Sequence, residues 1–160
     1  MPTTTLGYLH LVAASLSILL GAFQLIRTRR DQLHRRVGYT YVGAMAVNGV
    51  TALTVYEFTG GFNIFHALAL YSLLSITLAI QPMLANPRPL EWKRKHYMWV
   101  AWSYAGLLAA AVTEFLVRVV HAEGWLSAAL GSPPVILIAA FLIPRFAPAR
   151  RGAALLATGT

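Results

Sequence analysis

The chain has 160 residues, of which 58% are hydrophobic and 11% are charged, and its formal net charge is +8. A typical soluble domain carries about 25% charged residues, so this composition indicates an integral membrane protein of one domain. The basic residues form short clusters between apolar runs and not one continuous face, which excludes a nucleic-acid-binding module. The sequence contains no cysteine, which excludes disulfides, iron–sulfur clusters and zinc–thiolate sites.

Five apolar segments are each long enough to cross about 30 Å of hydrocarbon as a helix. The predicted spans are Leu6–Ile26, Val37–Phe58, Phe62–Leu84, Tyr97–Val120 and Leu126–Ile143. We therefore expect an all-α fold, a polytopic transmembrane helical bundle whose first four spans form a four-helix core. Residues 1–146 would make the single transmembrane domain, and residues 147–160 would make a cytoplasmic tail.

The positive charges lie in alternate links of this predicted topology. Residues 27–36, 88–95 and 145–151 hold 12 of the 13 Lys and Arg residues, and five spans would place these regions on one side. Cytoplasmic loops carry an excess of Lys and Arg. The sequence therefore predicts a multi-pass protein of the bacterial inner membrane, with its N-terminus outside and its C-terminus in the cytoplasm.

Four histidines lie near the ends of alternate spans. His10 and His66 are just inside the outer ends of spans 1 and 3, whereas His34 and His96 are at the cytoplasmic mouths of spans 2 and 4. Neutral imidazole is a standard axial ligand of haem iron, so two histidines from facing helices can hold one haem b. The pattern predicts one or two haems, with an outer pair and an inner pair, and the outer pair gives the stronger signal because it lies about a turn inside the hydrocarbon. A simpler interpretation is that each histidine places its polar tip in interfacial water.

A non-haem metal site is a second interpretation of the outer histidines. His10 and His66 would supply two imidazoles, and Glu114, or Glu57 at the outer end of span 2, would supply a carboxylate. This ligand set suits non-haem iron or zinc. Glu114 also lies four residues before Arg118, and an ion pair along the helix is the simpler interpretation of that spacing.

Spans 1 and 2 each carry a face of small and polar side chains at helical spacing. The face of span 1 comprises His10, Ala14, Ser17, Gly21 and Gln24, and that of span 2 comprises Gly38, Tyr41, Met45, Asn48 and Ala52. Small residues on interior faces allow close approach of helices. The same faces would also leave room for a flat cofactor, so the sequence does not decide between packing and binding.

Three groups of residues resemble a bacterial membrane-protein family of unknown function, the DUF2306 group. The first group is His10 with Gly21 and Gln24 in span 1. The others are HRRxGxxYxG from His34 to Gly43 and HxxWxxxSYA from His96 to Ala105, with Arg118 beyond them. The resemblance covers about residues 6–120, and the family name implies no activity.

The layout is also similar to cytochrome b561 and related two-haem membrane cytochromes. There, four consecutive helices each supply one histidine and alternate helices share a haem. The resemblance implies the pairs His10–His66 and His34–His96, in a haem b electron carrier that serves a quinone- or ascorbate-type oxidoreductase. The partners then expected are the lipid bilayer, a quinone or another redox protein, and other subunits of a membrane complex.

A cofactor-free accessory subunit of a larger complex is the alternative function. Span 5 carries small residues suited to helix contact, which are Ala128, Ala129, Gly131, Ala139 and Ala140. Apolar faces on span 5 too conspicuous for lipid contact alone, together with co-purification of a partner, would distinguish this function from electron transfer.

Overall fold

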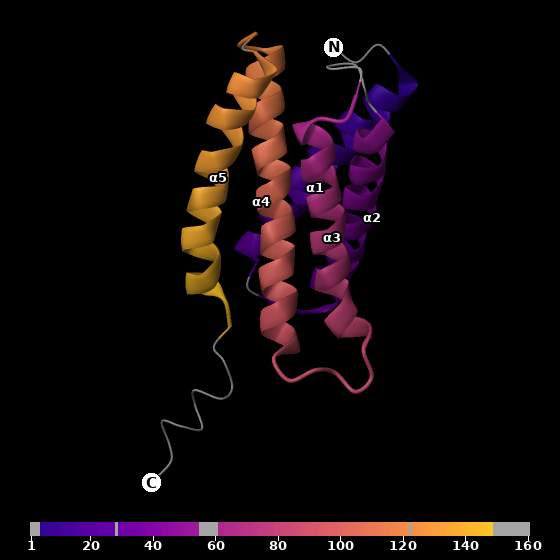
Figure 1. Cartoon of the computed structure of the whole chain (residues 1–160). Helices are drawn as coiled ribbons and strands as arrows, with labels where there is room; N and C mark the ends of the chain where they lie inside the picture. Colours follow the sequence, from indigo (N-terminus) through magenta and orange to yellow (C-terminus); the bar gives the residue numbers. More distant parts are fainter. Residues whose placement is uncertain (1–3, 28, 55–60, 122, 149–160) are drawn as a thin grey trace.

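The computed structural model describes residues 4–27, 29–54, 61–121 and 123–148, and these residues form five α-helices. The helices are α1 (Thr5–Ile26), α2 (Gln32–Thr54), α3 (Ile64–Leu84), α4 (Trp92–Arg118) and α5 (Gly124–Phe146). They run alternately up and down beside one another (Figure 1), which confirms the expected all-α bundle. The predicted end of span 2 at Phe58 lies outside the described residues.

Several helices extend beyond the predicted spans. α2 begins at Gln32 and not at Val37, and α4 begins at Trp92 and not at Tyr97. α5 continues through Pro144, where the sequence predicts its end. The hydropathy of the sequence marks where the hydrocarbon of the membrane ends. A helix can continue beyond that point into the interface, because its polar side chains meet water there.

The first four helices form the expected core, and α5 packs on the outside of α4. α1 packs on α2, α2 on α3 and α3 on α4, and a smaller contact between α4 and α1 closes the ring. α1 is tilted in Figure 1, where it passes behind the other helices from the side of α2 to the side of α4. The hydroxyl of Tyr104 donates to the carbonyl oxygen of Ile18 at 3.2 Å, so the C-terminal half of α1 meets the middle of α4.

The interior of the bundle is rich in small and polar side chains. Ser17, Ser75 and Ser103 are 0% exposed, and each donates its hydroxyl to a backbone carbonyl one turn earlier in its own helix. The exterior is lined with large apolar side chains such as Leu19 and Leu137. This arrangement suits a bundle in lipid, where close approach of small residues and internal polar bonds hold helices together.

Four of the helices are long and apolar enough to cross a membrane, namely α1, α3, α4 and α5. The chain is therefore an integral multi-pass membrane protein. The described part of α2 is less apolar because it begins with the polar segment from Gln32 to Arg36 and carries Asn48 and Thr51, which are buried, on its inward face. α2 nevertheless lies alongside α3 over the same length in Figure 1.

The small residues of α5 are used partly within the chain itself. Gly131 lies directly against Thr113 of α4, and Ala139 packs with Ala101 and Ala105 in the seam between the two helices. Ala129 and Ala140 remain exposed. Part of the face expected to bind another subunit is therefore covered by α4.

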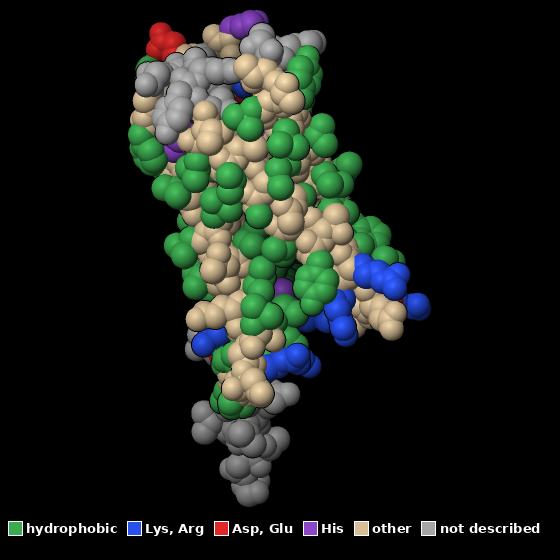
Figure 2. Space-filling view, turned by 90° about the vertical axis from the view of Figure 1, so that its right-hand side faces the viewer, with side chains coloured by type: hydrophobic (Ala, Val, Ile, Leu, Met, Phe, Trp, Pro, Cys, Tyr) green, Lys and Arg blue, Asp and Glu red, His purple; other side chains and the backbone are tan. Residues whose placement is uncertain are grey.

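Basic side chains gather at one end of the molecule (Figure 2). This end holds the link from α1 to α2, the link from α3 to α4 and the C-terminal end of α5. We call it the basic end, and the end that holds the other two links the opposite end.

Candidate functional site at the basic end

The first turn of α2 is fixed from two directions. Asp31 precedes the helix, and its Oδ1 accepts the backbone N–H of His34 at 3.1 Å. This bond and the ion pair with Arg27 hold the pKa of the exposed Asp31 carboxyl below its usual 3.8. From α1, Gln24 donates its Nε2–H to the carbonyl oxygen of His34 at 2.7 Å. The backbone of His34 is thus held both by its own helix cap and by the neighbouring helix.

The ring of His34 is half-buried at the basic end, before the apolar segment of α2 begins. Its Nδ1 is buried and has no hydrogen-bond partner among the described residues. Burial, followed by the charges of His96 and Arg30, lowers the pKa of His34 from its ordinary 6.5. A lowered pKa favours neutral imidazole at neutral pH, which is the form that binds metal ions.

His96 is held by a single hydrogen bond from α4 to α3. Its Nδ1 lies 2.9 Å from the carbonyl oxygen of Ala79. A carbonyl oxygen can only accept, so Nδ1 carries the proton and donates it. Nε2 is then left with the lone pair, and metal-bound histidines are commonly oriented by such a bond from their other nitrogen.

A direct contact between α2 and α4 relates the positions of these two histidines along their helices. The hydroxyl of Tyr41 on α2 lies 3.0 Å from Oγ of Ser103 on α4. His34 precedes Tyr41 by seven residues, and His96 precedes Ser103 by seven residues. Seven residues are about two helical turns, or roughly 10 Å. Both histidines therefore lie about two turns toward the basic end from one shared contact.

Close packing of α1 against α4 closes the interior beside this contact. A Cβ on Gly21 would overlap the ring of Tyr104 and lie 3.1 Å from the ring of Tyr41. Only a glycine lets α1 approach these two aromatic rings so closely. The residues of the sequence motifs thus meet in one place, because α1, α2 and α4 converge at this level.

At the opposite end, His10 is bound to α2. Its Nδ1 lies 3.2 Å from the carbonyl oxygen of Asn48 and 3.1 Å from the hydroxyl of Thr51. Asn48 is 9% exposed, in keeping with the packing role expected of a polar residue inside a bundle. The side chain of His10 links α1 to α2, which is a structural use of the ring.

His66 forms part of the N-terminal cap of α3. Asn63 caps the helix by accepting the N–H of Phe65 at 2.9 Å, and Nδ1 of His66 lies 3.0 Å from the Asn63 side-chain oxygen and 3.3 Å from its backbone nitrogen. This is a capping box in which histidine takes the place usually held by Glu or Gln. The His66 ring is 1% exposed and lies 5.2 Å from the ring of Phe62.

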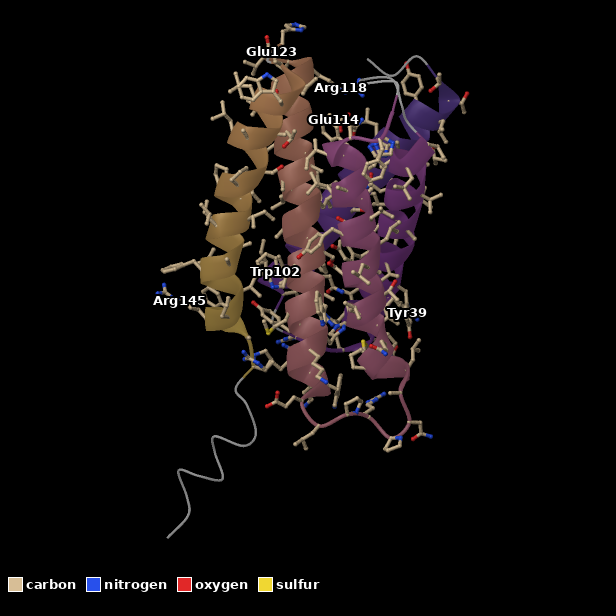
Figure 3. All side chains as sticks on the ribbon, viewed as in Figure 1. Tyr39, Trp102, Glu114, Arg118, Glu123 and Arg145 are labelled. Atoms are coloured by element: carbon tan, nitrogen blue, oxygen red, sulfur yellow. The ribbon has the colours of Figure 1, made fainter. Side chains whose placement is uncertain are left out.

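The residues considered for a non-haem metal site are not brought together. Among the described residues, no group of three His, Asp or Glu side chains is placed to hold a metal ion, and these residues include His10, His66 and Glu114. Glu114 forms an ion pair of 2.7 Å with Arg118, as its spacing suggests, and Figure 3 shows both toward the opposite end of α4. The alternative carboxylate, Glu57, lies outside the described residues.

Three features of the basic end are not evident from the sequence. Arg30 lies close enough to affect both His34 and His96 electrostatically, Gln24 holds the His34 backbone, and the carbonyl of Ala79 orients His96. The helical spacing of span 1 placed Gln24 on its polar face, which indicated that Gln24 contacts a neighbouring helix but not which residue it binds. The other two depend on how neighbouring helices are placed, which local sequence does not encode.

Comparison with known proteins identifies one family. The family described as predicted membrane protein (DUF2306) matches residues 7–148. Neither the curated proteins nor the solved structures contain a match to the chain.

Proposed function

The chain belongs to the DUF2306 family of predicted membrane proteins, and we propose from the arrangement of its histidines that it is a transmembrane electron-transfer protein that binds haem b between His34 and His96. The observation that carries the proposal is the shared register of these two residues. Each lies seven residues from one partner of the bond between Tyr41 and Ser103. Two imidazoles at one height on different helices are the arrangement needed to supply both axial ligands of one haem.

The protonation and the hydrogen bonding of both imidazole rings fit a role as axial ligands. The lowered pKa of His34 favours its neutral form, and its buried Nδ1 has no competing partner among the described residues. The bond from His96 to the Ala79 carbonyl orients the other ring and leaves Nε2 as the electron-pair donor. These side chains therefore meet the chemical requirements for iron ligation without first breaking another hydrogen bond of the ring.

The charges around the pair also suit a haem, which carries two propionates. Arg30 acts electrostatically on both histidines, and further basic side chains flank them in the sequence, namely Arg35 and Arg36 after His34 and Lys93 before His96. When bound, the haem would supply one-electron oxidation and reduction. The chain would hold and orient it, neutralise its propionates, and exchange electrons with a quinone or another redox protein.

We propose one haem and not two. His10 is bonded to α2 and His66 takes part in the cap of α3, so at the opposite end the rings already have structural uses. These bonds are made through Nδ1, as that of His96 is, so the one-haem proposal rests on the shared register of His34 and His96 and on the Nδ1 of His34, which has no partner among the described residues. Haem stoichiometry distinguishes the one-haem proposal from the two-haem alternative.

The decisive experiment is a dithionite-reduced minus air-oxidised absorbance spectrum of the purified protein, with haem quantified per chain. We expect b-type bands and one haem per chain after expression with ample haem. No Soret absorbance under these conditions would overturn the proposal and favour the cofactor-free accessory subunit. Two haems per chain would instead support the outer pair as a second site.

We also propose that the basic end faces the cytoplasm of a bacterial inner membrane, in keeping with the positive-inside rule. The chain has no cysteine, so single cysteines report orientation without background. A membrane-impermeant maleimide added to intact cells should label His121→Cys, on the exposed link between α4 and α5, but not Arg88→Cys at the basic end. The reverse labelling would overturn the orientation and leave the haem proposal standing.

A further inference from the structure

The outward face of α4 carries a groove at the basic end that the proposed haem site does not use. Its volume is about 470 Å³. It is lined by the apolar and aromatic side chains of Tyr71, Met98, Trp99 and Trp102 and by the charged side chains of Glu91, Arg94 and Lys95. A second hollow of about 340 Å³ shares Lys95 and Trp99 and extends the groove over the C-terminal part of α3. Figure 3 shows Trp102 between α4 and α5.

The polarity of the groove changes along α4. Glu91 immediately precedes the helix, and Trp102 lies eleven residues further on, which corresponds to roughly 16 Å along the axis. The charged side chains occupy the part nearest the basic end, and the aromatic side chains occupy the part that runs toward the middle of the bundle. Such a gradient matches an amphipathic molecule with its polar head at the membrane surface and its chain in the hydrocarbon.

The three charged side chains of the groove are not neutralised by one another. The ion pairs between described residues are Arg27–Asp31 and Glu114–Arg118, so neither Arg94 nor Lys95 is paired with Glu91. Arg94 donates one Nη1–H to the carbonyl oxygen of Pro148 at 3.1 Å, which leaves its other N–H groups for a ligand. The groove thus offers two cations and one carboxylate within a single turn of helix.

We propose that this groove binds a phospholipid whose headgroup carries both a phosphate and a primary ammonium, that is, phosphatidylethanolamine. Arg94 and Lys95 would bind the phosphate, Glu91 would accept hydrogen bonds from the ammonium, and an acyl chain would lie along Trp99 and Trp102. Basic pockets between transmembrane helices commonly hold lipid headgroups. An acidic headgroup without an amine would leave Glu91 facing a second anion, and a choline headgroup has no N–H to donate to it.

The test is lipid binding to the purified full-length chain in detergent, measured by native mass spectrometry. The probes are phosphatidylethanolamine, phosphatidylglycerol and phosphatidylcholine with identical acyl chains. We expect phosphatidylethanolamine to bind most tightly. The double variant Arg94→Gln/Lys95→Gln should weaken its binding roughly 25-fold, since each of the two basic side chains contributes roughly a fivefold change in affinity. Glu91→Gln should abolish the preference over phosphatidylcholine.

The matched control is Arg88→Gln/Lys93→Gln, which removes two charges from the same end at positions that do not line the groove. It should retain the preference for phosphatidylethanolamine. An equal loss in this control, equal binding of the three lipids, or tighter binding of phosphatidylglycerol would overturn the proposal. All variants alter charged side chains near the surface, and circular dichroism verifies their helix content. The test requires no haem, so its outcome is independent of the function proposed above.

Discussion

The two ends of the bundle use the same residue type in different ways. At the opposite end, the ring of His10 bonds to α2 and the ring of His66 helps to cap α3. At the basic end, it is the backbone of His34 that is held by neighbours, and one bond to a carbonyl orients His96. His34 is thus the histidine that differs, because its backbone is bonded to neighbours while its Nδ1 has no partner among the described residues.

The tilt of α1 gives its two ends different helix neighbours. α1 crosses from the side of α2 to the side of α4, and its contact with Tyr104 at Gly21 lies near its C-terminal end. The four-helix ring is therefore closed toward the basic end, where motif residues from three helices meet. Near its N-terminal end, α1 turns His10 toward α2 alone.

Exchanging histidines for alanine at each end should produce the largest contrast. His34→Ala or His96→Ala removes one proposed axial ligand, so we expect loss of the low-spin b-type spectrum and of most bound haem. His10→Ala and His66→Ala should keep one haem per chain, because those rings serve packing and capping. The measurement is the reduced-minus-oxidised spectrum with haem quantified against protein.

These four variants also control for one another. All shorten a histidine near a helix end, so a general loss of folding would affect both pairs, and size-exclusion chromatography would reveal it. Loss of haem from the His10 and His66 variants, with retention in the His34 and His96 variants, would reverse the assignment of the site.

Gly21→Ala should have the next largest effect, on stability. The added Cβ would overlap the Tyr104 ring, and overpacking of this kind costs about 1–3 kcal/mol. Gly43→Ala is the matched control, because a Cβ at Gly43 meets nothing within 4 Å and alanine favours helix by up to about 1 kcal/mol. Unfolding by heat or denaturant in detergent measures both. Equal stability of the two variants would show that α1 does not close on α4 at Gly21.

Local sequence patterns predicted the parts of this structure that depend on local physics. Hydropathy located every helix, and helical spacing identified Ser17, Gly21, Tyr41 and Met45 as inward-facing, which the structure confirms. The spacing of Glu114 and Arg118 likewise predicted their ion pair. These features follow from segment length and the 3.6-residue period, and they require no knowledge of neighbouring helices.

The sequence favours the outer histidine pair, whereas the proposed haem site uses the inner pair. Counting residues puts His10 and His66 at similar depth, but it cannot show that α1 tilts or that Asn63 recruits His66 into a cap. The influence of Arg30 on both inner histidines was equally hidden, because it depends on where the link between α1 and α2 lies. Tertiary placement decides these points.

Asn63→Ala tests the structural use of the opposite end. The substitution removes the side chain that accepts the N–H of Phe65, and loss of an N-cap typically costs about 1 kcal/mol. We expect a lower unfolding temperature with no change in haem content. Thr4→Ala removes the exposed cap of α1, where Thr4 accepts the N–H of Gly7, and serves as the comparison. A change in haem content in Asn63→Ala alone would instead tie the α3 cap to the site.

The smallest effect concerns pH and isolates the electrostatics of the basic end. The charged or titratable groups that act on His34 are His96 of α4 and Arg27, Arg30 and Asp31 of the adjoining link. Their net effect, added to burial, lowers the pKa of His34 below 6.5. Iron binds the neutral ring, so acid should release haem only at a pH below that of an ordinary histidine.

Arg30→Gln removes one cation that lowers this pKa, so the pKa of His34 should rise and haem should be released at a higher pH than in the unaltered chain. Arg29→Gln removes an exposed neighbouring charge that is not among the groups acting on His34, and its release curve should stay in place. Soret absorbance recorded during acid titration measures both.

Haem content at pH 8, where His34 is neutral in every variant, separates this effect from loss of a contact between Arg30 and a haem propionate. Equal haem content at pH 8 with a shifted release midpoint would show that Arg30 acts by tuning the pKa of His34. Reduced content at pH 8 with an unchanged midpoint would assign it to anchoring the haem, and identical curves would show that the charge of Arg30 does not reach the pair.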